Sequence, residues 1–215
     1  GARVRRVSLR AQAGAWWLDM DELLAAVTPA TRVLVLNAPN NPTGWTLSRA
    51  EQETLLAHCR RTGTWILADE VYERLYFEPT ENGCAPSFLD VSQPDDRLVV
   101  VHSFSKSFLM TGWRLGWLVL PRGHLDAMGK LIEFNTSCAP VFVQRAALVG
   151  LERTADVTPQ LVAHLKSEVN AGSSFGRALA TGLPQVTVTS LPLPGLIAEA
   201  GAAQAATVAR GFERP

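Results

Sequence analysis

The sequence predicts an α/β protein: a three-layer sandwich around a mainly parallel β-sheet covered by helices. Short continuous apolar runs, typical of strands buried on both faces, recur at 33–36, 65–68 and 98–101. Segments with apolar residues at helical spacing precede the first of these runs and separate the first run from the second. Strands separated by helices usually pair in parallel. With 215 residues, 47% of them hydrophobic, the chain is long enough to bury a substantial core.

The first predicted helix and strand occupy residues 21–36. Apolar residues recur at helical spacing from Asp21 to Val27, and acidic residues in the first turn suit the helix dipole. Thr28-Pro29 ends this helix. The run from Val33 to Leu36 predicts a strand covered on both faces, and residues 37–44 form the loop that follows.

A second helix is expected between the strands at 33–36 and 65–68. Ser48 followed three residues later by Glu51 has the capping-box pattern. The apolar face continues to Cys59, and Gly63 supplies a stop.

The pattern continues less regularly after residue 70. Residues 98–101 predict a third buried strand, and residues 115–120 a fourth. Beyond Gly150 the predicted elements are helices at 161–169 and 175–179 and a strand at 185–191. Residues 195–209 are rich in alanine and glycine and have no assigned element.

The charge balance, the length of the apolar stretches and the placement of cysteines and histidines disfavour several classes of function. Basic and acidic residues both number 20 and form no basic block, so we expect no nucleic-acid partner. No apolar stretch is long enough to cross a bilayer and no leader pattern is present, so we expect a cytoplasmic protein. The three cysteines and four histidines are scattered, which predicts neither a disulfide scaffold nor a metal site.

Polar side chains follow three of the predicted strands at the point where each ends. These residues are Asn41, Asp69 and Ser103. Ligands of open α/β sheets bind beyond the carboxyl ends of the strands, so the three residues are expected to meet at one edge. This convergence predicts a functional site.

Lys106 is the candidate catalyst at this edge. Most lysines are solvated surface residues, which is the simplest interpretation of any single one. Here, however, Lys106 follows an apolar strand and two serines and precedes Phe108-Leu109-Met110, a context that would partly desolvate its amine. A desolvated lysine amine has a lowered pKa and attacks carbonyl groups to form an imine.

The neighbouring residues are of the types that an imine-bound, phosphate-bearing cofactor needs. Arg114 can bind two phosphate oxygens with its planar fork, and Ser103 and Ser105 can donate to the same phosphate, although serines also cap turns. Asp69 ends an apolar run and needs a partner, which a protonated pyridine nitrogen, an internal arginine or a backbone amide would supply. Tyr72 is either packed or within reach of a phenolic oxygen on the same ring.

Four ordered segments give a specific resemblance. They are Asn41-Pro42-Thr43-Gly44, Asp69-Glu70-Val71-Tyr72, Ser103-Phe104-Ser105-Lys106 and Thr111-Gly112-Trp113-Arg114-Leu115-Gly116. Together they resemble the signatures of class I and II aminotransferases, which are fold type I pyridoxal phosphate enzymes. The resemblance extends from about Arg32 to Leu151.

The resemblance implies a role for each motif residue. Lys106 would form the Schiff base with pyridoxal 5'-phosphate, and Ser103, Ser105 and Arg114 would bind its phosphate. Asp69 would pair with the pyridine nitrogen. Asn41 and Tyr72 would contact the phenolic oxygen, and family members often have a cis bond at the proline that matches Pro42.

The resemblance also implies how the whole protein is organised. Residues 1–150 would be the large cofactor-binding domain without its N-terminal part, and residues 151–215 a partial or diverged small α+β domain. Relatives are longer and act as homodimers on an amino acid and a 2-oxo acid. Their glycine-containing phosphate loop and stacking aromatic residue precede the matched region. Their carboxylate-binding arginine has no match here, since Arg210 and Arg214 lie in a different context.

The sequence leaves three functions open. The first is an aminotransferase, of which this chain is a fragment. The second is a carbon–sulfur lyase that uses the same cofactor groups. The third is a truncated, non-catalytic remnant, which the presence of both Lys106 and Asp69 disfavours.

Overall fold

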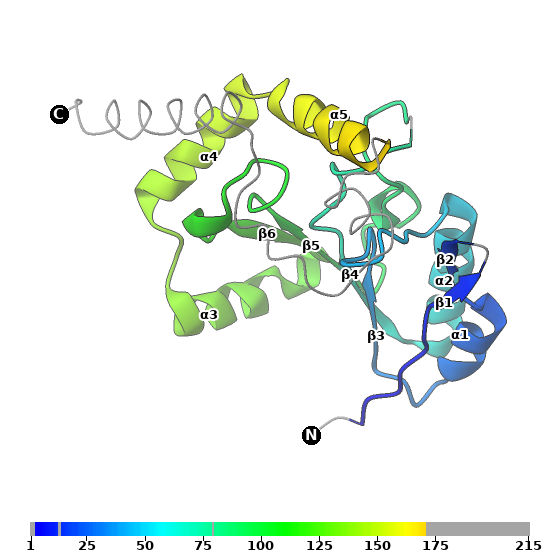
Figure 1. The fold of residues 1–215 in the computed structure, drawn as a ribbon. Coiled ribbons are helices and arrows are strands. Elements are labelled where there is room, and N and C mark those ends of the chain that lie inside the picture. Colours follow the sequence, from blue (N-terminus) through cyan, green and yellow to red (C-terminus); the bar gives the residue numbers. More distant parts are fainter. Residues whose placement is uncertain (1–2, 13, 79, 171–215) are drawn as a thin grey trace, which may run out of the picture.

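The computed structural model describes residues 3–170 except residues 13 and 79, and its centre is a four-stranded sheet (Figure 1). The strands β3 (Val33–Asn37), β4 (Trp65–Asp69) and β5 (Leu98–Ser103) are parallel and adjacent. β6 (Gly116–Val119) pairs with β5 in the antiparallel direction. The predicted α/β fold with a mainly parallel sheet is therefore confirmed.

The direction of β6 follows from its connection. β3 and β4 are joined through a helix, which carries the chain back across the sheet as a parallel pair requires. Between Ser103 and Gly116 there is only a turn segment with one short 3-10 helix, Thr111–Trp113. Because this segment crosses no face of the sheet, the chain returns beside β5 in the opposite direction.

The remaining elements surround this sheet. β1 and β2 form a separate antiparallel pair. The bounds of these strands and of the helices are β1 Arg10–Gln12, β2 Ala15–Trp17, α1 Met20–Ala26, α2 Arg49–Thr62, α3 Leu125–Thr136, α4 Val141–Arg153 and α5 Val157–Asn170.

The two ends of α2 have the predicted chemistry. The backbone N–H of Glu51 donates to Ser48 Oγ, and the backbone N–H of Ser48 donates to Glu51 Oε2 at 2.7 Å. Both halves of the capping box are therefore present. At the other end, Gly63 adopts a left-handed conformation with φ of +71°, which residues with a Cβ rarely adopt.

The main core lies on one face of the sheet. Alternate residues of β3, β4 and β5 point to this face and pack against α1 and α2. The buried side chains of this cluster are Leu23, Val27, Leu34, Leu36, Leu47, Leu55, Leu56, Cys59, Ile66, Ala68, Phe88, Leu98 and Val100.

The other face of β3 corrects the sequence-based prediction. Val33 is 47% exposed and Val35 is 65% exposed, so β3 is not covered on both faces within the described part of the chain. The segment 3–9 lies along this strand but leaves a groove of about 960 Å³ against it. An uninterrupted apolar run therefore marks a strand here, but it does not show that both faces are packed.

The later helices belong to a second region. α4 supplies Ala146 and Ala147 to a small core with Phe104 and Met110, which lie just after β5. The predicted helix at 161–169 is part of α5, whereas the elements predicted at 175–179 and 185–191 and the tail 195–215 lie outside the described residues. No described helix is long and apolar enough to span a membrane. All three cysteines are free.

A bidentate ion pair joins the end of α2 to the turn before β5. Arg60 Nε and Nη2 donate to the two carboxylate oxygens of Asp96 at 2.7 and 2.6 Å. These hydrogen bonds lower the pKa of the Asp96 carboxyl below its ordinary value. The ionised carboxylate therefore stabilises the fold above the pKa of Asp96 in the unfolded chain, and this contribution is lost as pH falls through the folded pKa.

We predict that Asp96→Asn lowers the free energy of unfolding by about 1 kcal/mol at pH 7, a modest value because Arg60 is 45% exposed. Urea unfolding at pH 7 and pH 3 tests this. The difference from the wild type should shrink at pH 3, and the exposed neighbour Asp95→Asn is the control. A difference that is equally large at both pH values would contradict the ion-pair account.

Candidate functional site

The register of the parallel strands places polar side chains on one face at the carboxyl edge of the sheet. Asn37 of β3 is paired with Asp69 of β4, and Asp69 with Val101 of β5. Side chains alternate along a strand, so Ser103, two residues after Val101, lies on the same face as Asp69. This face is opposite to the main core.

The loop after β3 brings Asn41 to the segment after β4. The backbone N–H of Asn41 donates to Asn37 Oδ1 at 2.9 Å, which anchors the loop to the strand end. The Asn41 Nδ2 then donates to the Tyr72 hydroxyl at 2.9 Å. The peptide bonds Ala38–Pro39 and Asn41–Pro42 are both cis.

Lys106 lies beside Tyr72. Its Nζ is 5.3 Å from the centroid of the Tyr72 ring, within the range of a cation–π interaction. The residue is partly buried rather than fully solvated. Asn41, Tyr72 and Lys106, which come from three segments far apart in the sequence, therefore form a continuous series of contacts.

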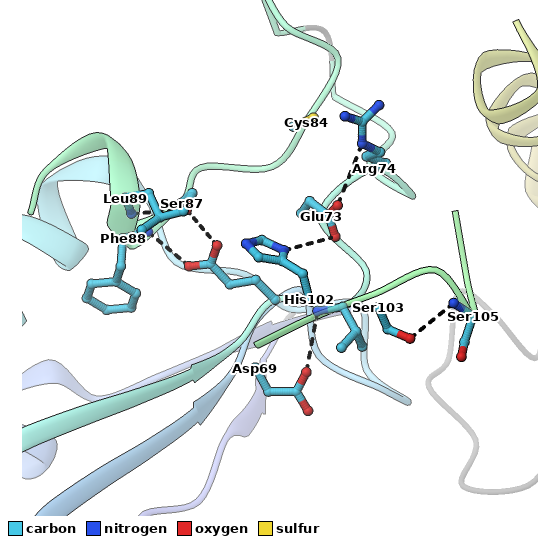
Figure 2. Close-up of polar contacts among 12 residues, drawn as sticks. Asp69, Glu73, Arg74, Cys84, Ser87, Phe88, Leu89, His102, Ser103 and Ser105 are labelled. Carbon is cyan, nitrogen blue, oxygen red and sulfur yellow. Dashed lines mark hydrogen bonds and ion pairs between the residues drawn. The ribbon is translucent and has the colours of Figure 1, made fainter. Parts of the chain in front are cut away.

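The carboxylate of Asp69 has one protein partner that the structure identifies. Its Oδ1 accepts a long hydrogen bond of 3.4 Å from the backbone N–H of Val71 (Figure 2). The residue is partly buried at the end of β4. Its remaining lone pairs can accept a hydrogen bond from a ligand that lies over this edge.

The two predicted serines are joined by a turn. Ser103 Oγ accepts from the backbone N–H of Ser105 at 3.0 Å (Figure 2) and makes a long hydrogen bond of 3.4 Å to the carbonyl of Leu115. The carbonyl of Ser105 accepts from Thr111 Oγ1 at 2.9 Å. These bonds tie the start of the Lys106 segment to the segment that leads into β6.

Arg114 is exposed and has a left-handed backbone, with φ of 55° and ψ of 50°. Its Nη1 donates to the carbonyl of Thr111 at 2.8 Å, and within the described ranges no hydrogen bond joins its guanidinium to Ser103 or Ser105. Leu109 also has a positive φ, of 54°. Side-chain-bearing residues in this conformation cluster at functional sites, where surrounding contacts hold them.

Gly116, the glycine that ends the fourth motif, lies where a side chain would not fit. A Cβ built on it would lie 2.5 Å from the carbonyl oxygen of His102, closer than real Cβ atoms approach. Gly116 pairs with Ser103 across β5 and β6. The glycine thus lets β6 approach the strand end that carries the serines.

A polar cluster on the opposite face was not predicted. Glu70 is only 3% exposed and accepts hydrogen bonds from Ser87 Oγ at 2.6 Å and the backbone N–H of Phe88 at 2.9 Å. Burial raises the pKa of the Glu70 carboxyl above its ordinary value. Strand alternation could have located this cluster, because Glu70 directly follows Asp69 and must point the other way.

His102 belongs to the same cluster. It is 8% exposed, stacks on Trp117 with ring centroids 4.9 Å apart, and places Nδ1 3.8 Å from Glu73 Oε2. Figure 2 shows His102 and Glu73 on one side of the strand end and Asp69 on the other. Asp69 and Glu70 are thus neighbours in sequence whose side chains lie on opposite faces of the sheet.

Two surface grooves of the described residues lie apart from Asp69, Tyr72 and Lys106. One of about 530 Å³ lies between β6 and α3, and a second lies along β3. Neither is lined by Asp69, Tyr72 or Lys106. The described residues contain no cluster of side chains suited to hold a metal ion.

The donor set fits pyridoxal 5'-phosphate. A ring with a phenolic oxygen, a basic nitrogen and a phosphate requires hydrogen-bond donors, a carboxylate and a cation, respectively. The Tyr72 hydroxyl, the Asp69 carboxylate and the Arg114 guanidinium are groups of these three kinds, and Tyr72 is the one of them that contacts the Lys106 amine in the described residues.

Comparison with known proteins gives one family. The family model described as aminotransferase class I and II matches residues 1–172. Aromatic-amino-acid aminotransferase 2 from Thermococcus litoralis is 37% identical over 62% of this chain and 34% of its own length. The arginine–pyruvate transaminase AruH of Pseudomonas aeruginosa is also 37% identical, over 71% of this chain and 37% of its own length. The chain thus spans just over a third of the length of these relatives.

The solved structures that this chain resembles are also aminotransferases. The aspartate aminotransferase of Thermotoga maritima is 34% identical and has a TM-score of 0.64 over 72% of this chain and 39% of its own. The N-succinyldiaminopimelate aminotransferase of Mycobacterium tuberculosis is 27% identical, with a TM-score of 0.69 over 76% of this chain and 43% of its own.

We predict that Glu70 makes the fold less stable as pH rises above 4.5, the ordinary pKa of its carboxyl. A raised pKa means that the folded chain binds this proton more tightly than the unfolded chain. The stability that the proton confers is complete below the unfolded pKa and is lost through the folded pKa.

Glu70→Gln removes the titration, so the unfolding free energy of the variant should decline less with pH than that of the wild type. Urea unfolding from pH 4 to pH 8 measures both slopes, with the exposed Glu81→Gln as control. Identical slopes in the wild type and Glu70→Gln would contradict the prediction.

Proposed function

The chain belongs to the class I and II aminotransferase family, and we propose that its protein is a pyridoxal 5'-phosphate-dependent aminotransferase that moves an amino group from an L-amino acid to a 2-oxo acid. One observation carries the assignment to particular residues. The Lys106 amine lies against Tyr72, whose hydroxyl is held by Asn41, at the sheet edge that also presents Asp69.

When bound, pyridoxal phosphate supplies an aldehyde for covalent attachment and a ring that withdraws electrons from the substrate. Lys106 would be the residue for the attachment, since it is partly buried and its Nζ lies over the Tyr72 ring. When not attached to the cofactor, the same Nζ would be the base that takes the proton from the substrate's α-carbon. Lys106 therefore serves as both nucleophile and general base.

Asp69, Tyr72 and Asn41 would orient the ring. The Asp69 carboxylate keeps acceptor capacity beyond its bond to Val71 and would hold the ring nitrogen in its protonated form. The Tyr72 hydroxyl already accepts a hydrogen bond from Asn41, so its own proton is available for the phenolic oxygen. The Asn41 contact thus directs the Tyr72 proton toward the ligand.

The phosphate would lie where the Lys106 segment meets the start of β6. Ser103, Ser105 and Arg114 would donate to its oxygens. The backbone N–H of Phe104 donates to the carbonyl of Leu115 at 3.1 Å, which fixes the position of Arg114 relative to the serines. A guanidinium can bind two phosphate oxygens with two parallel hydrogen bonds, for which the ammonium of a lysine is a poorer geometric match.

We also propose a homodimer built on a large domain, residues 1–150, and a small one that begins at residue 151. Exposed apolar side chains on α3 and α4 support a covered surface in the assembled protein. Leu131 is 63% exposed, Phe134 94% and Phe142 54%, which is unusual for apolar groups that face water. Exclusion chromatography with light scattering would test the dimer.

We predict that Lys106→Ala abolishes covalent cofactor attachment because it removes the amine proposed to form the imine. Treatment with pyridoxal phosphate and borohydride, followed by peptide mass mapping, should give an adduct at Lys106 in the wild type. The exposed Lys130→Ala variant should keep that adduct. An undiminished adduct yield in Lys106→Ala would refute the assignment.

The products formed from substrates distinguish the two enzyme classes. An aminotransferase leaves pyridoxamine phosphate after one half-reaction. A carbon–sulfur lyase instead releases pyruvate and ammonia from a cysteine conjugate, and that outcome would replace the proposed reaction while leaving the role of Lys106 unchanged.

We predict that Arg114→Lys weakens cofactor affinity about tenfold, because an ammonium replaces two parallel hydrogen bonds to phosphate with a point charge. Equilibrium dialysis against pyridoxal phosphate measures the dissociation constant. The matched control is Arg122→Lys, an exposed arginine at the N-terminal side of α3. Equal affinity in both variants would remove Arg114 from the phosphate site.

A further inference from the structure

A hydrogen bond connects α5 to the segment that carries Lys106. Thr158, in the first turn of α5, donates from Oγ1 to the carbonyl of Ser107 at 2.6 Å. Both residues are buried, with Thr158 8% exposed and Ser107 1% exposed. The contact joins residues 51 positions apart, and one of them is the immediate neighbour of Lys106.

This bond completes the hydrogen bonding of four successive carbonyls. The carbonyls of residues 104, 105 and 106 accept from Met110 N, Thr111 Oγ1 and Leu109 N, respectively, all within the same turn segment. Only the carbonyl of Ser107 is satisfied from another element. The orientation of the peptide group after Ser107 therefore depends on α5, because no donor within the segment bonds its carbonyl.

The interior around Ser107 offers little compensation for loss of this bond. Ser107 Oγ is itself buried and has no hydrogen-bond partner. A second unsatisfied polar atom next to it would carry the full desolvation cost of a buried carbonyl. The peptide after Ser107 would therefore reorient toward another donor, and Lys106 would move with it.

α5 also contacts the segment that follows Tyr72. Lys166 Nζ donates to the carbonyl of Phe77 at 2.8 Å. Thr158 and Lys166 are eight residues apart on one helix, a rise of about 12 Å. α5 thus contacts both the Lys106 segment and the segment that follows Tyr72, whose ring centroid lies 5.3 Å from the Lys106 amine.

We propose that Thr158 is a positioning residue that fixes the place of the Lys106 amine by holding the carbonyl of Ser107. α5 then sets where the amine lies relative to Tyr72, and a shift of α5 moves the amine. The proposal rests on the proposed function only for the chemical role of Lys106. The hydrogen bond and its effect on the segment can be tested without cofactor.

The test uses variants that differ in one hydroxyl. Thr158→Val keeps the shape of the side chain and removes the donor, whereas Thr158→Ser keeps the donor. Thr154→Val is the control, because Thr154 Oγ1 donates to the carbonyl of Gly150 within its own helix end. Thr158→Ala also removes the donor with no β-branch, and it replaces Thr158→Val if that variant does not fold.

The first measurement is hydrogen exchange of the cofactor-free chain. The amides of Leu109 and Met110 donate to the carbonyls of Lys106 and Phe104, so they report on the order of the segment. We expect exchange about tenfold faster in Thr158→Val, which corresponds to the loss of one buried hydrogen bond. Thr158→Ser and Thr154→Val should exchange within about twofold of the wild type.

The second measurement is the rate at which pyridoxal phosphate and borohydride label Lys106. This rate should fall about tenfold in Thr158→Val and recover in Thr158→Ser. Unchanged exchange, or faster exchange with an unchanged labelling rate, would overturn the positioning role. Failure of the wild type to label Lys106 would instead contradict the proposed function, while the exchange rates would still decide whether Thr158 orders the segment.

Discussion

The parallel pairing of β3, β4 and β5 is the constraint on which the site depends. Register alone places Asn37, Asp69 and Ser103 on one face at the same edge. A one-residue shift in β4 would turn Asp69 toward the core and Glu70 toward the ligand side. The buried cluster that receives Glu70 opposes such a shift, because the carboxylate accepts two hydrogen bonds there. The hydrogen bonds of Glu70 on the core face therefore stabilise the register that places Asp69 on the opposite face.

The segment between β5 and β6 is the second determinant. Its carbonyls are paired one after another, and Leu109 and Arg114 have positive φ. These features hold Lys106 in an irregular loop, where no helix or strand ladder would fix it. Gly116 lets the returning strand approach closely. Strand register thus fixes the side chains at the sheet edge, and individual hydrogen bonds fix the loop that carries Lys106.

Local chemistry made much of the fold predictable. The Ser48–Glu51 box and Gly63 bound α2 as expected, since caps act within a few residues. The exposed face of β3 was missed because an apolar run does not specify what covers it. The contacts of Tyr72 with Asn41 and Lys106 could not be derived from spacing, because they join distant segments. The roles of the site residues came from motif resemblance rather than from periodicity, and they stay predictions.

The central claim is that one small ring is tethered to Lys106 while its nitrogen is paired with Asp69. A crystal structure of the protein after reduction with pyridoxal phosphate and borohydride would test this most directly. The account predicts a bond from Lys106 Nζ to the cofactor and an Asp69 carboxylate oxygen at about 2.7–2.9 Å from the ring nitrogen. A cofactor attached to another amine, or an Asp69 side chain turned away from the ring, would contradict it.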